Sequence, residues 1–366
     1  LEKAILAGVH TGSLDVLSDT TAETIAELKA LADTAGVETV GTVIQNRSAP
    51  DNATYFGEGK LEEVKRMADE LGADVIIFDD ELSPVQVRNI TQELKMKVID
   101  RTMLILDIFA SRAITGEGKI QVELAQLRYM LPRLTGMGQE LSRQGGGIGT
   151  RGPGETKLET DRRHIRRRID SLSEELKDIQ RHRDLLRSRR KKDGQSVIAI
   201  VGYTNAGKSL LLNKLTGADV LAQNQLFATL DPTVRGLTLS DNREVRLVDT
   251  VGFIRKLPHH LIKAFKSTLE EVKYADLLIH VIDASNPEHM QHITVVESIL
   301  GELGAKGKPT IAVFNKIDIL GLDDIVTGSV EGAAATVSVS VKEGWYLDKL
   351  LQKVEELTPG RKQRVS

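Results

Sequence analysis

The chain has no cysteine among its 366 residues, and aromatic residues make up only 4% of it. The absence of cysteine excludes disulfide bonds and thiolate metal sites. No apolar run approaches the roughly eighteen residues that a membrane-spanning helix needs, and the chain shows no signal-peptide pattern. We therefore expect a monomeric protein of the cytoplasm that does not span a membrane.

A chain of this length exceeds one ordinary domain and suits two or three domains that each bury a core. The formal net charge is only −3, but positive charge is concentrated in one segment. Residues 161–192 contain thirteen Lys or Arg and six Asp or Glu, a local excess of seven positive charges. Such a segment is typical of a polyanion-binding protein, although a solvated helix face has the same composition.

The first 112 residues alternate between strand and helix patterns. Short apolar runs predict strands at Ala4–Val9, Val37–Ile44, Asp74–Phe78 and Lys97–Ile99, with amphipathic helices between them. Residues 1–112 are therefore predicted to form a small parallel α/β domain. Gly57–Lys60 precedes one of the helices and raises the alternative of a second phosphate site. It lacks the full spacing of such a site, and paired glycines before a helix more often form a turn.

Two long helices are predicted over residues 113–192. Leu124, Leu127, Leu131 and Leu134 share one face of the first helix. In the second, apolar residues step by four and three as in a heptad seam, at Ile165, Ile169, Leu172, Leu176 and Ile179. The pattern predicts an antiparallel coiled hairpin whose seam serves packing.

The segment that joins these helices, Gly136–Gly154, is rich in glycine and is predicted to be irregular. One interpretation is a flexible linker. The other is a functional loop, because glycine lets a backbone approach RNA closely and arginine pairs with phosphates or stacks on bases. On the second interpretation, the RNA-binding candidates are Arg143, Arg151, Lys157, Arg162, Arg163, Arg166 and Arg167.

Gly202–Ser209 fits the phosphate-binding pattern G-x-x-x-x-G-K-[ST] at every fixed position. An apolar run precedes it at Val197–Val201, and leucines follow it on one side of a predicted helix. Residues 193–366 are thus predicted to form a P-loop domain, in which Lys208 reaches the β- and γ-phosphates and Ser209 holds Mg²⁺. The phosphate-binding candidates are Gly202, Tyr203, Thr204, Asn205, Ala206, Gly207, Lys208, Ser209 and Gly252.

Asn315-Lys316-Ile317-Asp318 follows a predicted buried strand, Thr310–Phe314. A carboxylate there can accept both hydrogens of the guanine N1–H and N2 amine pair, and adenine offers no such pair. GTP is therefore predicted over ATP. The guanine-binding candidates are Asn315, Lys316, Asp318, Ser340, Val341 and Lys342, of which the last three follow another predicted strand.

Two segments between these motifs are candidates for sensing the γ-phosphate. Asp249-Thr-Val-Gly252 follows a predicted strand, so that Asp249 suits Mg²⁺ through a water and the Gly252 amide can approach the γ-phosphate. Leu226–Thr233 lies where a switch segment belongs, and either Thr229 or Thr233 can give its hydroxyl to Mg²⁺. We favour Thr229; the other interpretation is a threonine in a solvated turn.

The ordered motifs, together with Tyr55–Lys60, Gly145–Arg163 and Val251–Arg255, resemble the HflX family in the Obg–HflX group of translational GTPases. The likeness covers almost the whole chain and implies a P-loop GTPase domain that binds GTP and GDP. It also implies a factor that engages the large ribosomal subunit and its RNA through the glycine-rich loop and dissociates stalled or idle ribosomes. Because members often carry a further C-terminal domain and this chain begins with Leu, we expect that the chain is trimmed at both ends.

The sequence departs from the GTPase pattern at Phe253, where many Ras-type GTPases have a Gln that orients the attacking water. Phenylalanine makes no such hydrogen bond, so hydrolysis by the chain alone is expected to be slow. Related GTPases with Asn at the place of Asn205 bind K⁺ beside the phosphates, which implies K⁺ as a second cofactor with Mg²⁺. The catalytic candidates are Asn205, Lys208, Thr229 and Gly252. The alternatives are a ribosome-assembly GTPase that binds RNA and a scaffold whose nucleotide site is regulatory.

Overall fold

The computed structural model describes residues 1–13, 19–143, 153–192, 195–217, 226–258, 261, 266–321 and 330–358. By its contacts the chain divides into two compact units, which are described one at a time. Unit 1 contains Leu1–Ser111, Lys119–Asp178 and Pro258–Ala264, and unit 2 contains Arg112–Gly118, Ile179–Leu257 and Phe265–Ser366. The segment predicted as a hairpin domain, residues 113–192, is thus shared between the two units.

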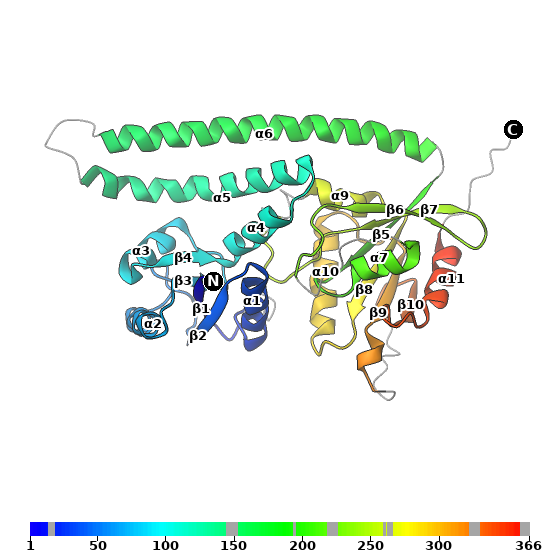
Figure 1. The fold of residues 1–366 in the computed structure, drawn as a ribbon, viewed down its shortest axis with the longest axis horizontal. Helices are drawn as coiled ribbons and strands as arrows, with labels where there is room; N and C mark the ends of the chain where they lie inside the picture. The colour runs from blue at the N-terminus through cyan, green and yellow to red at the C-terminus, as the bar shows by residue number, and fades with distance from the viewer. Residues whose placement is uncertain are drawn as a thin grey trace. The chain divides into compact units, whose positions relative to one another are not determined.

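Unit 1 begins with a parallel sheet of four strands in the order β2-β1-β3-β4 (Figure 1). The strands are β1 (Lys3–His10), β2 (Glu38–Asn46), β3 (Val75–Phe78) and β4 (Lys97–Asp100), and the helices are α1 (Ala22–Thr34), α2 (Glu58–Leu71), α3 (Pro84–Leu94) and α4 (Arg101–Arg112). Buried residues of α2 and α3 pack on one face of this sheet. All four predicted strands are present, and the α/β prediction for this region is confirmed.

The contacts at the start of α2 bear on whether Gly57–Lys60 forms a turn or a second phosphate site. Gly57 is the N-cap of α2, and its backbone N–H donates to Oε1 of Gln45 at 3.1 Å. The Gln45 side chain therefore already accepts the hydrogen bond that the Gly57 N–H would have to donate to a phosphate. This contact favours the turn over the second phosphate site.

Helices α5 (Gly116–Arg143) and α6 (Pro153–Lys192) follow. Within unit 1 they lie side by side, with Arg168 of α6 paired to Glu123 of α5 at 2.7 Å. Leu172 is buried in the seam, and Ile165, Ile169 and Leu176 are half-buried. No helix in the described parts of the chain is long and apolar enough to cross a membrane.

The prediction that Gly136–Gly154 is irregular throughout is wrong at both ends, because α5 continues to Arg143 and α6 begins at Pro153. Met137, Gln139, Glu140 and Leu141 are strong helix formers, which offset a cost of about 1 kcal/mol for each glycine within the helix. Proline suits the first turn of α6 because its missing N–H is not needed there. Residues 144–152 lie outside the described residues.

Unit 2 is built on a sheet of six strands in the order β10-β9-β8-β5-β7-β6, in which only β6 is antiparallel to its neighbour. The strands are β5 (Ser196–Gly202), β6 (Thr233–Thr238), β7 (Glu244–Asp249), β8 (Leu277–Asp283), β9 (Thr310–Asn315) and β10 (Ala335–Ser338). The helices are α7 (Lys208–Thr216), α9 (Lys266–Tyr274), α10 (His289–Glu302) and α11 (Leu347–Leu357), with a short 3₁₀ helix at Ile317–Ile319.

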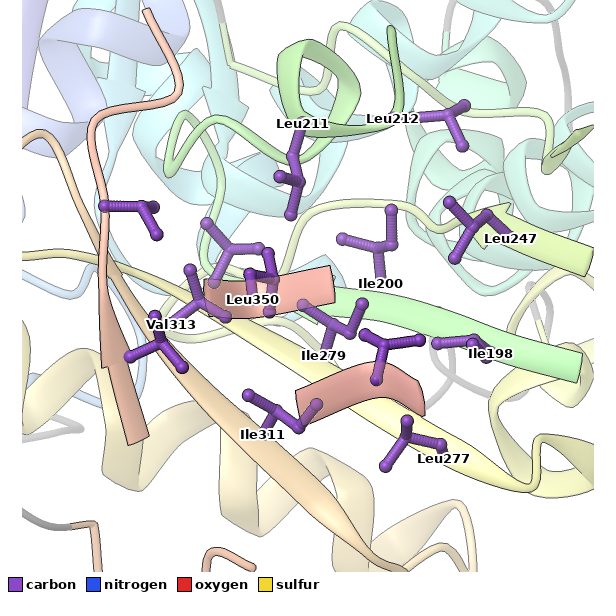
Figure 2. Close-up of a cluster of buried hydrophobic side chains, with 14 of the residues drawn as sticks. Ile198, Ile200, Leu211, Leu212, Leu247, Leu277, Ile279, Ile311, Val313 and Leu350 are labelled. Carbon is purple, nitrogen blue, oxygen red and sulfur yellow. The ribbon is translucent and has the colours of Figure 1, made fainter. Parts of the chain in front are cut away.

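Alternate residues of these strands enter cores on opposite faces of the sheet, as the period of a strand requires. Ile311 and Val313 of β9 join the cluster that includes Leu211 of α7 and Leu350 of α11, shown in Figure 2. Ala312 and Phe314 face the other way and pack with Ile293 of α10. Because the sheet is covered on both faces, the carboxyl ends of β5, β7 and β9 form the natural ligand edge.

Candidate nucleotide site

A cavity of about 440 Å³ opens at this edge of the sheet in unit 2. It is large enough for a cofactor-sized ligand. Among the predicted site residues, it is lined by Thr204, Asn205, Gly207, Lys208, Ser209, Thr229, Gly252, Asn315, Lys316, Asp318 and Lys342. Gly202, Tyr203, Ala206, Asp249, Ser340 and Val341 are not in the lining. The structure thus brings segments from five separate parts of the chain to one cavity.

The glycines of the phosphate loop are required by close backbone approach. Gly202 has φ of +152° and Gly207 has φ of +101°, which side chains rarely adopt. A Cβ atom at Gly202 would lie 2.2 Å from the carbonyl oxygen of Val281, and one at Gly207 would lie 2.4 Å from Nδ2 of Asn315. Neither position has room for a side chain.

Lys208 begins α7 and is almost fully buried. Its Nζ donates to the carbonyl oxygen of Tyr203 at 2.8 Å. Burial lowers the pKa of this ammonium group to about 8, although the charge of Asp249 opposes the shift. A Cβ atom at Gly252 would lie 3.1 Å from Nζ, so the glycine of the Asp249–Gly252 motif is directly beside the lysine.

Three predicted Mg²⁺ residues meet at the end of β7. Ser209 Oγ donates to Oδ2 of Asp249 at 2.6 Å, Thr229 Oγ1 donates to the same oxygen at 3.1 Å, and the two hydroxyls are 2.8 Å apart. Burial raises the pKa of Asp249, against the opposing charge of Lys208. Oδ1 of Asp249 is buried and has no hydrogen-bond partner among the residues that the structure describes.

This arrangement fits a hard divalent cation. All the donor atoms are oxygens, which Mg²⁺ prefers, and within the described part of the chain a buried carboxylate oxygen is left without a protein partner. Thr233, the alternative to Thr229, is the first residue of β6 and is paired in register with Asp249. The geometry therefore favours Thr229 as the residue that would accompany Ser209 at the metal.

At the opposite end of the cavity, Oδ1 of Asp318 accepts a hydrogen bond from Oγ of Ser340 at 2.6 Å. Asn315 makes contacts within the protein, and its predicted contact with guanine stays a prediction. Its Nδ2 donates to the carbonyl oxygen of Ala206 at 2.9 Å, and its Oδ1 accepts from the N–H of Val341 at 3.0 Å. It joins the phosphate loop to the segment after β10, and Asp318 is left as the carboxylate able to read a base.

The two lysines predicted at this end are held differently. Lys316 lies in the left-handed region at φ of +67° and is paired with Asp283 at 2.7 Å between Nζ and Oδ2. Lys342 is exposed and lies 3.5 Å from Oε1 of Glu343. Both residues line the cavity.

Two residues of the phosphate loop point in different directions. Asn205 is exposed on the cavity rim and has φ of +61°, which asparagine tolerates better than most residues. The Tyr203 ring stacks on His292 of α10, with centroids 3.7 Å apart and planes at 7°. Its Oη accepts from the N–H of Arg255 at 2.9 Å. The Tyr203 side chain therefore supports the loop from behind.

Phe227, which lies in the switch segment, was not among the predicted site residues. It is buried with φ of +54°, and its N–H donates to Oγ1 of Thr204 at 3.0 Å, so it fastens the switch to the phosphate loop. A bulky aromatic side chain in a segment predicted to act as a switch was the available signal. Phe253 is also buried, and its backbone pairs with Gly202 and Thr204 at 3.1 and 2.7 Å.

The RNA-binding candidates are outside this cavity. Arg163, Arg166 and Arg167 are exposed on α6 in unit 1, and Arg162 on the same helix is half-buried. Arg143 and Lys157 lie in α5 and α6, but their side chains are outside the described parts of the structure. Arg151 lies outside the described residues altogether. RNA binding by these seven residues stays a prediction.

Comparison with known proteins matches three family descriptions in succession. "GTP-binding GTPase N-terminal" matches residues 22–110, "GTP-binding GTPase Middle Region" matches residues 112–190, and "50S ribosome-binding GTPase" matches residues 197–316. A crystal structure of a GTP-binding protein from the archaeon Sulfolobus solfataricus in complex with GDP covers 98% of both chains. It has 30% identity and a TM-score of 0.50.

Curated relatives are closer in sequence. The GTPase HflX of Caldanaerobacter subterraneus subsp. tengcongensis is 55% identical over 97% of this chain and 80% of the relative. The GTPase HflX of Escherichia coli is 44% identical over 98% of this chain and 83% of the relative. With a P-loop cavity in place and this identity over nearly its full length, the chain belongs to the HflX family of GTPases.

Proposed function

We propose that the chain hydrolyses GTP to GDP and phosphate in the cavity of unit 2. The observation that carries this proposal is the junction of Ser209, Thr229 and Asp249 beside the buried Lys208, at one end of a cavity whose other end carries Asp318. The first group suits a metal-bound triphosphate and the last suits guanine. Family membership supports the same reaction.

Each residue has a defined part in this reaction. Backbone N–H groups of the phosphate loop at the start of α7 would donate to the phosphate oxygens, and Lys208 would place its positive charge against them. Ser209 and Thr229 would hold Mg²⁺ directly and Asp249 through water, where the ion supplies neutralisation of the phosphate charge. Gly252 lies beside Lys208, where its N–H would donate to a γ-phosphate.

The attacking water needs another partner, because the Phe253 side chain is buried and carries no hydrogen-bonding group. We propose that Asn205, exposed on the rim of the cavity, helps to hold a K⁺ ion that neutralises charge at the phosphates. Hydrolysis should then be faster in K⁺ buffer than in Na⁺ buffer. Equal rates in the two buffers would contradict this part of the proposal.

The proposed partner is the large ribosomal subunit. The family description "50S ribosome-binding GTPase" matches residues 197–316, and exposed arginines on α6 suit RNA phosphates. We infer that the GTP form binds the subunit and splits stalled or idle ribosomes through this binding energy, and that hydrolysis releases the protein. Sedimentation with separated subunits, in a non-hydrolysable GTP analogue and in GDP, tests the partner.

The nucleotide site is tested by comparing two lysines of the same helix. We expect Lys208→Ala to lower the hydrolysis rate by at least about a hundredfold, because it removes a charge that acts on the transferred phosphoryl group. Lys214→Ala, on the exposed face of α7, is the matched control and should leave the rate unchanged. Equal rates for the two variants in a phosphate-release assay would show that hydrolysis occurs elsewhere.

A further inference from the structure

Asp231 connects the switch segment to the start of α5. It lies two residues after Thr229, and its carboxylate accepts hydrogen bonds from both backbone and side chain. Oδ2 accepts from the N–H groups of Ile114 and Thr115, each at 2.9 Å, and Oδ1 accepts from Thr115 Oγ1 at 2.6 Å. All these residues belong to unit 2.

The residues at the start of α5 suit the binding of the Asp231 carboxylate. Thr115 directly precedes α5, and its Oγ1 also accepts from the N–H of Gly118 at 3.0 Å, so it caps the helix. A Cβ atom at Gly118 would lie 2.3 Å from Oδ1 of Asp231, so the approach requires glycine there. A negative charge is also favourable at a helix N-terminus, where the free N–H groups carry partial positive charge.

The other end of the same short segment lies at the metal residues. Thr229 contacts Ser209 and Asp249, Leu230 is buried, and Thr233 begins β6. Only one residue separates Thr229 from Asp231. Fixing either of these residues therefore limits the positions open to the other.

We propose that Asp231 is a positioning residue for hydrolysis, which holds Thr229 at the metal by anchoring the switch to the first turn of α5. We call the contact of Asp231 with Ile114 and Thr115 the joint. A cavity of about 220 Å³, lined in part by Asp231, Thr115 and Gly118, borders it. This space allows the carboxylate to withdraw when the switch moves. We call the observed contact the closed form, and in our proposal it opens when the switch moves.

By thermodynamic linkage, the Asp231 contact transmits an effect from the switch to the start of α5 and also from α5 to the switch. Ordering of the switch by a triphosphate favours the closed joint and fixes the start of α5, and a partner that fixes the start of α5 favours the ordered switch by the same free energy. Helix α5 begins in unit 2 and continues into unit 1. This second step rests on the proposed function, because it supplies a route by which the large subunit would stimulate hydrolysis.

A positioning role is distinguished from a folding role by comparing the effect of a substitution on GTP hydrolysis with its effect on GDP binding. Asp231→Ala should lower the hydrolysis rate at saturating GTP by about tenfold or more, since small misplacement of a reacting group is costly. Its affinity for GDP should stay within twofold of the original, because GDP lacks the γ-phosphate that the switch contacts. Asp231→Asn, which keeps the shape and one acceptor oxygen, should recover part of the rate.

Hydrogen exchange gives a readout that a merely structural residue would not change. In the original chain, a non-hydrolysable GTP analogue should slow exchange of the Ile114, Thr115 and Gly118 amides relative to GDP. In Asp231→Ala this difference between the nucleotides should vanish. Asp241→Ala is the matched control, because Asp241 is an exposed aspartate of the same unit that contacts Arg243 in the β6–β7 turn.

Thr115→Val provides a second variant that acts from the other side of the joint. It should reproduce the rate loss of Asp231→Ala, and the double variant should be no slower than either single variant. Additive losses, or an exchange difference that survives in Asp231→Ala, would overturn the proposal. Failure of the proposed function would look different, since the original chain would then neither bind nor hydrolyse GTP.

Discussion

At the scale of single residues, Asp318 gives the site its expected preference for guanine. One carboxylate oxygen accepts from Ser340, and the side chain lines the cavity, so the carboxylate is oriented before any base arrives. Such orientation lowers the cost of ordering the side chain on binding. The identity of the base should therefore depend on the hydrogen-bonding pattern of this one group.

Asp318→Asn should lower GTP affinity by about a hundredfold, because an amide cannot accept both guanine hydrogens and places a donor against a donor. The same variant should favour xanthine nucleotides, whose C2 oxygen accepts from the new amide. Competition binding with GTP and XTP measures both effects. Asp348→Asn, on the exposed first turn of α11, is the control. Unchanged preference in Asp318→Asn would show that the base is read elsewhere.

A second residue links stability to pH. His280 lies buried in β8, and burial lowers its pKa to about 4, with the nearby charge of Lys208 adding to the shift. The unfolded chain binds the proton more tightly, with a pKa near the ordinary value of about 6.5. Stability is therefore fully present above about pH 6.5 and is lost as the pH falls toward 4.

Between pH 7.5 and 5 the original chain should lose about 2 kcal/mol more stability than His280→Leu, which has no proton to gain. Urea unfolding followed by the fluorescence of Trp345 measures this, since it is the single tryptophan of the chain and lies in unit 2. His182→Leu, at an exposed position of the same unit, should behave like the original chain. Parallel pH profiles for the original chain and His280→Leu would contradict the assignment.

At the scale of helices and strands, a buried ion-pair cluster holds α4 to its neighbours in unit 1. Arg101, the first residue of α4, is 1% exposed; its Nη1 lies 2.9 Å from Oδ1 of Asp79, and its Nη2 also contacts Glu27 of α1. By contrast, Arg168 and Glu123 pair across α5 and α6 with both side chains in solvent. The two pairs should differ greatly in their effect on stability.

Arg101→Ala should destabilise the protein by about 3–5 kcal/mol, because it leaves buried carboxylates without their cation. Arg168→Ala should cost less than about 1 kcal/mol, as expected of an exposed pair. Urea unfolding followed by circular dichroism compares the two variants directly. A loss of similar size in both would mean that burial of Arg101 does not set its contribution.

The order and type of the elements could be predicted because they depend on local patterns. Apolar runs marked every strand of the unit 1 sheet, and the heptad seam marked α6. The extension of α5 through Gly136 and Gly138 could not, because two glycines outweighed the surrounding helix formers in the prediction. The capping contact of Asp231 with Thr115 joins residues 116 positions apart, and no local pattern reports such a contact.

The candidate site shows the same division. Gly202, Lys208 and Asp249 were found because their spacing matches a general phosphate-binding chemistry. The contacts of the Asn315 amide with Ala206 and Val341 could not be predicted, because they join segments far apart in the sequence. Phe227 was missed for the same reason, because it holds the switch through a hydrogen bond from its backbone N–H to Thr204.

At the scale of the whole molecule, the chain combines a nucleotide cavity in unit 2 with exposed arginines on α6 in unit 1. We propose that the bound nucleotide controls when these arginines bind RNA. Helix α5, which begins at the Asp231 contact and continues into unit 1, provides a continuous element between the two units. Subunit binding and hydrolysis should therefore respond to each other.

The most direct test of this account is the single-turnover rate of GTP hydrolysis, measured in K⁺ and Mg²⁺ with isolated large subunits, with isolated small subunits and without either. We predict slow hydrolysis by the chain alone, because Phe253 cannot orient the water. Large subunits should raise the rate by at least about tenfold, and small subunits should leave it unchanged. Equal rates in all three mixtures, or stimulation by small subunits alone, would contradict it.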